Sequence, residues 1–326
     1  MRTEFYLDKE TLSDMCFLSE ENPAAHDLLL KTWYELGIFI MPKNRPEHAR
    51  EIVSAVPEKY RKKWQEALMK FPVSRLNKEI SYLSQYQSEI SLNPLYSEIK
   101  SLLVSSSTDY NFIEKTVEHK LLNNSQNEAI RASHIANSLF FKQSEQLKDK
   151  QISSTELPDE IWKSRFHALS KHEKNIFIVD RYLGERVLRS TRSGKVKNNS
   201  LYFLLRKLKD YPAKFNISIF TDGKEANSPI YNALNSFMEN EKNLLNEITS
   251  FEIMSIRPVC FDTLTHDRYI RIGNNLCEIG LGMEIFEMDS KRRTSFSMKV
   301  ANKTDVYSLE EGIKNNDVRW TLKTPS

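Results

Sequence analysis

Apolar and polar positions alternate along the first half of the chain in a way that predicts strands and helices in turn. Short apolar runs at residues 4–7 and 38–41 are typical of strands, and residues 26–36 between them have the apolar spacing of a helix. This strand–helix–strand order indicates a βαβ unit. Helical spacing predicts four further helices, over residues 46–56, 57–71, 73–92 and 127–148.

The second half shows the same alternation and then a hairpin. Apolar runs predict strands at residues 217–221 and 251–256, and Ser228 before Pro229 is the expected start of a helix between them. Ile270, Arg271 and Ile272 alternate as in a half-buried strand, and the glycine-asparagine turn after them leads into a return strand over 276–279. We therefore expect a mixed sheet covered by helices.

The length and composition of the chain predict two domains. A chain of 326 residues with 40% hydrophobic residues is long and apolar enough for about two cored domains. The polar stretch 151–155 is the best linker, so we expect an α/β fold with a helix-rich α/β domain at residues 1–150. A second, mixed-sheet α/β domain is expected at residues 151–326.

Three features of the sequence predict a soluble protein of the cytoplasm. The three cysteines lack the spacing of a disulfide framework or a metal site, as expected in a reducing compartment. The first residues begin a folded segment and not a signal peptide. No apolar run approaches the length of a membrane span.

The net charge of +3 hides one strongly basic stretch. Residues 181–214 contain ten basic residues and only two acidic ones; the basic ones are Arg181, Arg186, Arg189, Arg192, Lys195, Lys197, Arg206, Lys207, Lys209 and Lys214. The Ser193-Gly194 pair predicts a flexible loop in the middle of the stretch. Such a loop attracts nucleic acid, phosphoinositide headgroups or acidic protein, or is a solvated insertion without a partner.

Acidic residues in the first half suggest a metal site. Asp8 follows the first predicted strand, and Glu51 and Asp109 are later acids that a metal centre would need. In this respect the first domain resembles PIN-type nucleases, in which several carboxylates hold Mg²⁺ or Mn²⁺ to activate water against a phosphodiester. The resemblance implies catalysis dependent on Asp8. The alternative is that Asp8 is a turn residue and Glu51 lies on a solvated helix face.

The second domain carries a more extensive resemblance. The His266-Asp267-Arg268 strand start, the turn after it and the Ile279-Gly280-Leu281-Gly282 run are similar to the phospholipase-D-like C-terminal domain of MIT-domain proteins. The strand that ends in Asp180-Arg181-Tyr182 matches the first strand of that family. The likeness spans approximately residues 160–320.

What the resemblance implies is an inert, anion-binding module. Active phospholipase-D-type enzymes place a lysine two residues after the histidine and an aspartate further on, where this chain has Arg268 and Gly273. Only one such motif is present, so we expect no catalysis in this domain. His266, Arg268 and Asp180 are instead expected to form a structural or anion-binding cluster, with a buried, hydrogen-bonded His266 as the alternative. The family also implies homodimerisation and binding to membranes through a basic surface.

Together these patterns predict a protein that engages nucleic acid. An N-terminal unit of this kind fused to a phospholipase-D-like module is, by analogy, an arrangement of bacterial conflict systems, including antiviral defence. Two other functions stay open. One is a peripheral adaptor on acidic membranes, and the other is a module that binds only protein.

Overall fold

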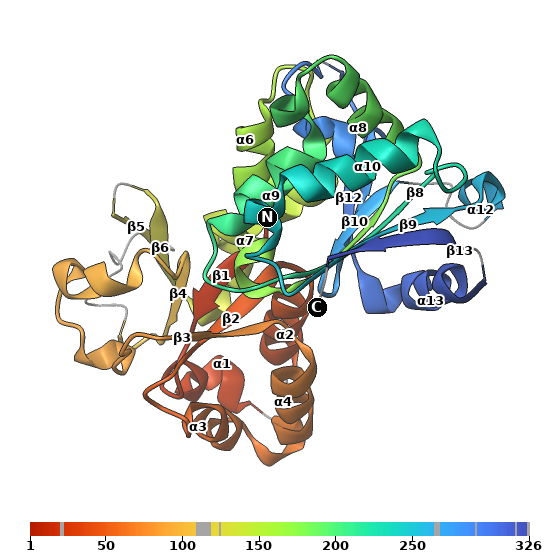
Figure 1. Ribbon diagram of the computed structural model, residues 1–326. Helices are drawn as coiled ribbons and strands as arrows, with labels where there is room; N and C mark the ends of the chain where they lie inside the picture. The colour runs from red at the N-terminus through yellow and green to blue at the C-terminus, as the bar shows by residue number, and fades with distance from the viewer. Residues whose placement is uncertain are drawn as a thin grey trace. The chain divides into compact units, whose positions relative to one another are not determined.

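A computed structural model of the chain describes residues 1–19, 23–108, 119–123, 125–263, 268–290, 292–316 and 318–324. The chain forms two compact units, Met1–Gln146 and Leu147–Ser326. Each unit contains its own sheet and its own helices, which confirms the expected α/β class (Figure 1). The predicted boundary at 150/151 lies four residues after the division in the structure.

The first unit is built on a six-stranded sheet with the order β3-β2-β1-β4-β6-β5. Its strands are β1 (Thr3–Tyr6), β2 (Gly37–Pro42), β3 (Val73–Leu76), β4 (Ser101–Val104), β5 (His119–Leu122) and β6 (Asn127–Arg131). All neighbours pair in parallel except β5, which is antiparallel to β6. The chain reverses its direction of progress across the sheet between β1 and β4, and crevices for ligands occur at such switch points.

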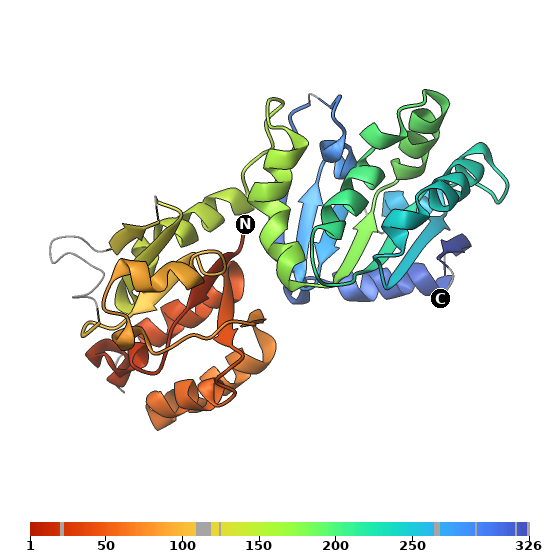
Figure 2. The ribbon, with the colours of Figure 1, turned by 60° about the vertical axis from the view of Figure 1, so that its left-hand side comes forward.

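Helices cover one face of this sheet (Figure 2). They are α1 (Met15–Leu18), α2 (Ala24–Leu36), α3 (His48–Ala55), α4 (Glu58–Lys70) and α5 (Leu139–Lys148). The side chains alternate along β1, so Phe5 packs among Trp33, Trp64 and Phe39 on the helical face. Tyr6 points to the opposite face, where residues of the segment between β3 and β4 pack against it.

Two of the predicted helices in this unit are wrong. Residues 73–92 form strand β3 and then short 3-10 turns, and residues 127–148 contain strand β6 before helix α5 begins. In both places the residues pair along a neighbouring strand, Val73 with Phe39 and Glu128 with Ser101. Pairing between distant segments outweighs the weak local preference for helix.

The second unit contains a seven-stranded mixed sheet with the order β12-β11-β10-β7-β8-β9-β13. Its strands are β7 (Asn175–Val179), β8 (Asn216–Thr221), β9 (Ser250–Ile256), β10 (Tyr269–Ile272), β11 (Asn275–Ile279), β12 (Phe296–Val300) and β13 (Val318–Lys323). Strands β7, β8 and β9 are parallel and the other pairings are antiparallel. The predicted hairpin is confirmed, with Ile270 opposite Cys277 and Gly273 at φ +55° in the turn.

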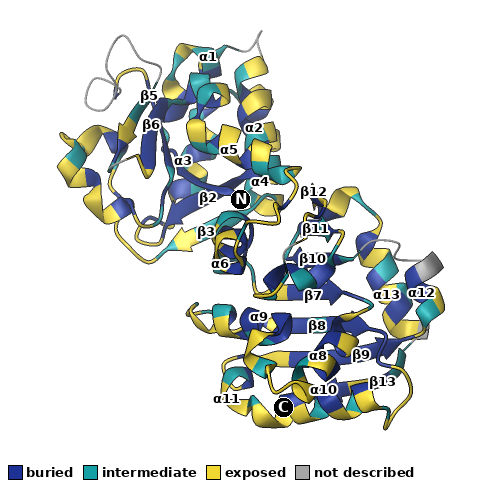
Figure 3. Ribbon diagram, turned by 90° about the horizontal axis from the view of Figure 1, so that it is seen from above, coloured by how far each residue is buried: buried dark blue, intermediate teal, exposed yellow. Residues whose placement is uncertain are grey.

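Both faces of this sheet are covered. The helices are α6 (Pro158–Ile161), α7 (His167–His172), α8 (Leu183–Arg192), α9 (Ser200–Lys209), α10 (Pro229–Asn240), α11 (Lys242–Leu245), α12 (Pro258–Thr263) and α13 (Val306–Asn316). Helices α8, α9 and α10 lie together along one face, and α13 packs on the other through Val306 and Ile313 (Figure 1). The strands between them are largely buried (Figure 3). Among the helices described, none combines the length and apolarity needed to cross a bilayer.

Candidate anion-binding site

Asp8 lies where β1 ends, as predicted, but its carboxylate is enclosed. Its Oδ1 accepts hydrogen bonds from the backbone N–H groups of Glu10 at 3.0 Å and Thr11 at 3.2 Å. Its Oδ2 accepts a hydrogen bond of 2.7 Å from the backbone N–H of Leu83. The side chain is 0% exposed, and this burial raises the pKa of Asp8 above its ordinary value. Asp8 thus joins the turn after β1 to a segment 75 residues away.

Glu51 on α3 is also surrounded by hydrogen-bond donors. Its two oxygens accept hydrogen bonds of 2.5 Å from Arg45 and from the Tyr82 hydroxyl, and the Lys9 ammonium lies 3.8 Å away. Burial acts to raise the pKa of Glu51, but the bonds from Tyr82 and Arg45 outweigh it and hold the pKa below its ordinary value. The carboxylate is therefore neutralised by side chains of the protein.

These surroundings do not fit a resident Mg²⁺ or Mn²⁺. A hard divalent cation needs several oxygen ligands that face a common accessible point. The Asp8 carboxylate is buried against backbone N–H groups, and Glu51 contacts two cations. Across the ranges that the structure describes, no three His, Cys, Asp or Glu residues converge as a metal site. Asp109 lies outside those ranges, so its part in a metal centre stays a prediction.

In the second unit, Asp180 follows β7 and is likewise buried, but its partner is Arg186 and not Arg268. The Asp180 carboxylate is paired with the Arg186 guanidinium and accepts a 2.7 Å hydrogen bond from the backbone N–H of Met283. Gly282 makes this possible: its φ is +57°, and a Cβ there would lie 2.4 Å from Asp180 Oδ2.

Arg268 lies over an aromatic ring beside this pair. Its guanidinium carbon is 4.8 Å from the centre of the Tyr182 ring. Asp180 and Arg268 of the predicted cluster therefore both lie against Gly282, but they do not pair with each other: Asp180 pairs with Arg186, and Arg268 lies over the Tyr182 ring. His266 lies outside the described residues, so its role as an anion ligand stays a prediction.

The basic stretch is a helix, a short turn and a second helix, which corrects the predicted flexible loop. Arg189 and Arg192 occupy the last turn of α8, Lys195 and Lys197 lie in the turn, and Arg206 lies on α9. These five side chains are exposed, and none forms an ion pair with a residue that the structure describes. Arg181 is only partly exposed, and its guanidinium lies 5.9 Å from the Tyr182 and Phe261 rings.

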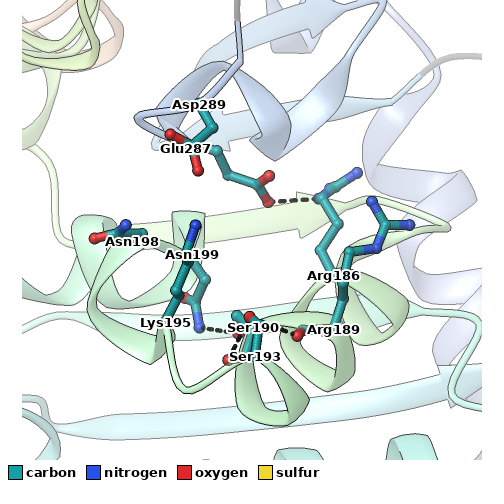
Figure 4. Close-up of a pocket in the computed structure, with 9 residues that line it drawn as sticks. All are labelled: Arg186, Arg189, Ser190, Ser193, Lys195, Asn198, Asn199, Glu287 and Asp289. Atoms are coloured by element: carbon teal, nitrogen blue, oxygen red, sulfur yellow. Dashed lines mark hydrogen bonds and ion pairs between the residues drawn. The ribbon is translucent and has the colours of Figure 1, made fainter.

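A polar pocket opens between the end of α8, the turn and the start of α9 (Figure 4). Its volume is about 100 Å³. The nine lining residues are all polar or charged: Arg186, Arg189, Ser190, Ser193, Lys195, Asn198, Asn199, Glu287 and Asp289. Three of them, Arg186, Arg189 and Lys195, belong to the basic stretch for which the sequence predicts anion binding. The pocket therefore contains three cations and two acids. Because Arg186 is paired with Asp180 and Glu287, the exposed cations of the pocket are Arg189 and Lys195.

The turn holds the pocket in shape through its own hydrogen bonds. The Asn199 side chain accepts a hydrogen bond of 2.8 Å from the backbone N–H of Tyr202, which caps α9. Its amide nitrogen donates to the Ser190 hydroxyl at 3.1 Å, tying the two helices together. The N-terminus of α9 thus begins at the pocket, and its macrodipole favours a negative charge there.

Glu287 is the unusual member of the pocket. Burial raises its pKa to about 7, although the Arg186 charge opposes the rise. Glu287 Oε1 lies 3.2 Å from Arg186 Nε as an ion pair, while the Asp180 carboxylate contacts Nη2 of the same guanidinium. The pocket therefore carries less negative charge at mildly acidic pH than its two acids suggest.

Sequence reasoning found the cations of this site but missed its polar members. Asn199 followed by a helical apolar pattern is a recognisable cap signal that was available in the sequence. Ser190 and Ser193 lie one helical turn from Arg186 and Arg189, and that spacing was also available. Glu287 is about a hundred residues from α8 in sequence, and nothing local places it there.

Comparison with known proteins yields no family for this chain. No protein-family model matches it, and a search of curated proteins finds no match.

Proposed function

We propose that the second unit binds nucleic acid by holding a backbone phosphate in the pocket between α8 and α9. The observation that carries this proposal is the presence of two exposed cations, Arg189 and Lys195, around a space of about 100 Å³ at the N-terminus of α9. Guanidinium and ammonium groups hold phosphate through charge-assisted hydrogen bonds, and a helix N-terminus favours a negative charge.

The exposed cations around the pocket support a polymeric anion and not a single ion. Arg192 ends α8, Lys197 lies in the turn that follows, and Arg206 lies on α9. Several exposed cations that form no ion pairs with described residues are suited to several phosphates, because each phosphate contact releases condensed counterions.

Nucleic acid fits the lining better than a membrane does. Membrane-surface segments combine cations with apolar side chains that enter the acyl boundary, and no apolar residue lines the pocket. One exposed apolar residue, Met288, lies next to Glu287 in sequence and is 53% exposed. A test of this proposal therefore also measures binding to acidic lipid vesicles.

Cleavage is not part of this proposal. The surroundings of Asp8 and Glu51 do not fit a metal, and Asp180 of the second unit is buried and ion-paired. The function supported best is binding without chemistry in this unit.

The test compares two double variants with the same change in charge. Arg189→Ala with Lys195→Ala removes two pocket cations, whereas Lys209→Ala with Lys242→Ala removes two exposed cations elsewhere in the unit. Affinity for labelled single-stranded and double-stranded DNA and RNA is measured between about 50 and 200 mM salt.

We expect the pocket variant to lose at least about tenfold in affinity, since charge-assisted bonds contribute about 1.5–3 kcal/mol each. The slope of log affinity against log salt should fall by about 0.7 for single strands, the value for the loss of one phosphate contact. Equal losses in the two double variants would refute the pocket. A loss confined to acidic vesicles would replace nucleic acid with a membrane surface.

A further inference from the structure

An exposed aromatic ring with two arginines near it lies at the other end of α8. The side chain of Tyr182 is 47% exposed. The Arg268 guanidinium lies 4.8 Å from the centre of its ring, and the Arg181 guanidinium lies 5.9 Å away. Aromatic rings and guanidinium planes are the surfaces on which proteins stack unpaired bases.

Buried residues hold this pair of groups in position. The backbone N–H of Tyr182 donates to Asp180 Oδ1 at 3.0 Å, and its carbonyl accepts from the backbone N–H of Arg186 at 3.0 Å. Arg268 is confined on its inner side by Gly282, where a Cβ would lie 2.8 Å from Arg268 Cδ. The arrangement is therefore preorganised, which lowers the entropic cost of binding.

Tyr182 is the residue that precedes helix α8, and two cations of the pocket lie on that helix. Arg186 and Arg189 follow Tyr182 by four and seven residues. At 1.5 Å per residue, Tyr182 and Arg189 lie about 10 Å apart along the axis. A stacking surface and a phosphate pocket thus lie within the reach of neighbouring nucleotides.

We infer that the ligand is a single strand, with an unpaired base stacked on Tyr182 and Arg268 and an adjacent phosphate in the α8–α9 pocket. The inference rests on the proposed function and names the class of nucleic acid. In a duplex the bases are already stacked on one another, so a duplex offers the phosphates but no free base face. Only a single strand offers both an unpaired base for Tyr182 at one end of α8 and a phosphate for the pocket at the other end.

The test uses a short labelled oligothymidine, an abasic strand of equal length and charge, and the matching duplex. Tyr182→Ala removes the ring and Tyr182→Phe retains it. Tyr307→Ala is the matched control, because Tyr307 is 42% exposed and lies 4.7 Å from the Arg271 guanidinium but is remote from the pocket in the fold. Thermal unfolding establishes that each variant is folded.

The wild-type chain should bind oligothymidine more tightly than the abasic strand or the duplex. Tyr182→Ala should weaken oligothymidine binding roughly 5- to 100-fold, Tyr182→Phe should bind it more tightly than Tyr182→Ala, and Tyr307→Ala should match wild type. Equal wild-type affinity for the base-bearing and abasic strands, or no difference between Tyr182→Ala and Tyr307→Ala, would overturn the inference.

The pocket variant separates this failure from that of the proposed function. If Arg189→Ala with Lys195→Ala still weakens binding of the abasic strand, the phosphate pocket stands and only the stacking is rejected. If that double variant binds the abasic strand as wild type does, the proposed function itself fails.

Discussion

Replacing Glu287 with glutamine tests the electrostatics of the pocket directly. Burial raises the pKa of Glu287 from its ordinary value of 4.5 to about 7 in the folded chain. A folded pKa above the unfolded one means that the folded state holds the proton more tightly, so stability is greatest below about pH 4.5 and is lost as the pH rises through 7. At 1.36 kcal/mol per pKa unit, this loss amounts to about 3 kcal/mol.

Glutamine cannot ionise, so the variant avoids that loss. We expect Glu287→Gln to match wild type at about pH 4.5 and to be more stable by up to about 3 kcal/mol at about pH 8.5. For a unit of this size the change corresponds to a rise of about 6–12 °C in Tm. Chemical and thermal unfolding across this pH range give the measurement.

Glu252 provides a control of opposite sign. Burial acts to raise its pKa, but hydrogen bonds from Ser218 and Lys314 outweigh it and lower the pKa. A lowered folded pKa contributes stability above the unfolded pKa that is lost as the pH falls, so Glu252→Gln should be destabilised at high pH and approach wild type in acid.

A stability difference for Glu287→Gln that stays constant across the pH range would refute the reasoning. In the same series, oligonucleotide affinity of wild type should fall as the pH rises through 7, and more steeply than in Glu287→Gln.

Two further substitutions test residues that close the ends of strands. Asp8→Ala leaves three backbone N–H groups without their acceptor, so it should lower the free energy of unfolding in urea by on the order of 3–5 kcal/mol. The control Asp14→Ala changes a partly exposed side chain and should cost about 1 kcal/mol. If Asp8→Ala is as stable as wild type, Asp8 is not structural and its predicted role in catalysis is open again. Gly282→Ala should destabilise the fold by more than about 2 kcal/mol, because the new Cβ would lie 2.4 Å from Asp180 Oδ2. The control Gly194→Ala has φ +70° but open space around it, and should cost about 1 kcal/mol. Equal costs would show that backbone strain alone accounts for both.

The sequence predicted those parts of the fold where local pattern and long-range pairing agree. The hairpin at Gly273 and the helix capped by Ser228 appear as expected, because the turn and cap residues specify them locally. Strands β3, β4, β5, β6, β12 and β13 were missed. Each is defined by pairing with another segment, as in the pairing of β13 with β9. Periodicity within one segment contains no information about such a partner.

The candidate site was predictable only in its charge. Counting basic residues between positions 181 and 214 identified Arg189 and Lys195, but it did not show that Arg186 is committed to Asp180. The count also did not distinguish the exposed cations from the buried Arg186. The distinction depends on which face of α8 packs on the sheet, and the 3.6-residue spacing of Leu183 and Val187 defines that face once the helix is recognised.

Asp8 and Asp180 show why an acid at the end of a first strand is weak evidence for catalysis. In both, Oδ1 accepts from the backbone N–H two residues later, and Oδ2 accepts a 2.7 Å hydrogen bond from a backbone N–H far along the chain. Each acid therefore fastens a distant loop to its sheet, which requires burial, whereas a reacting acid must face an accessible space. With both of these positions used for structure, the accessible polar chemistry of the second unit lies on helix α8 and the turn that follows it. That location is the reason for which we propose binding as the function of this unit.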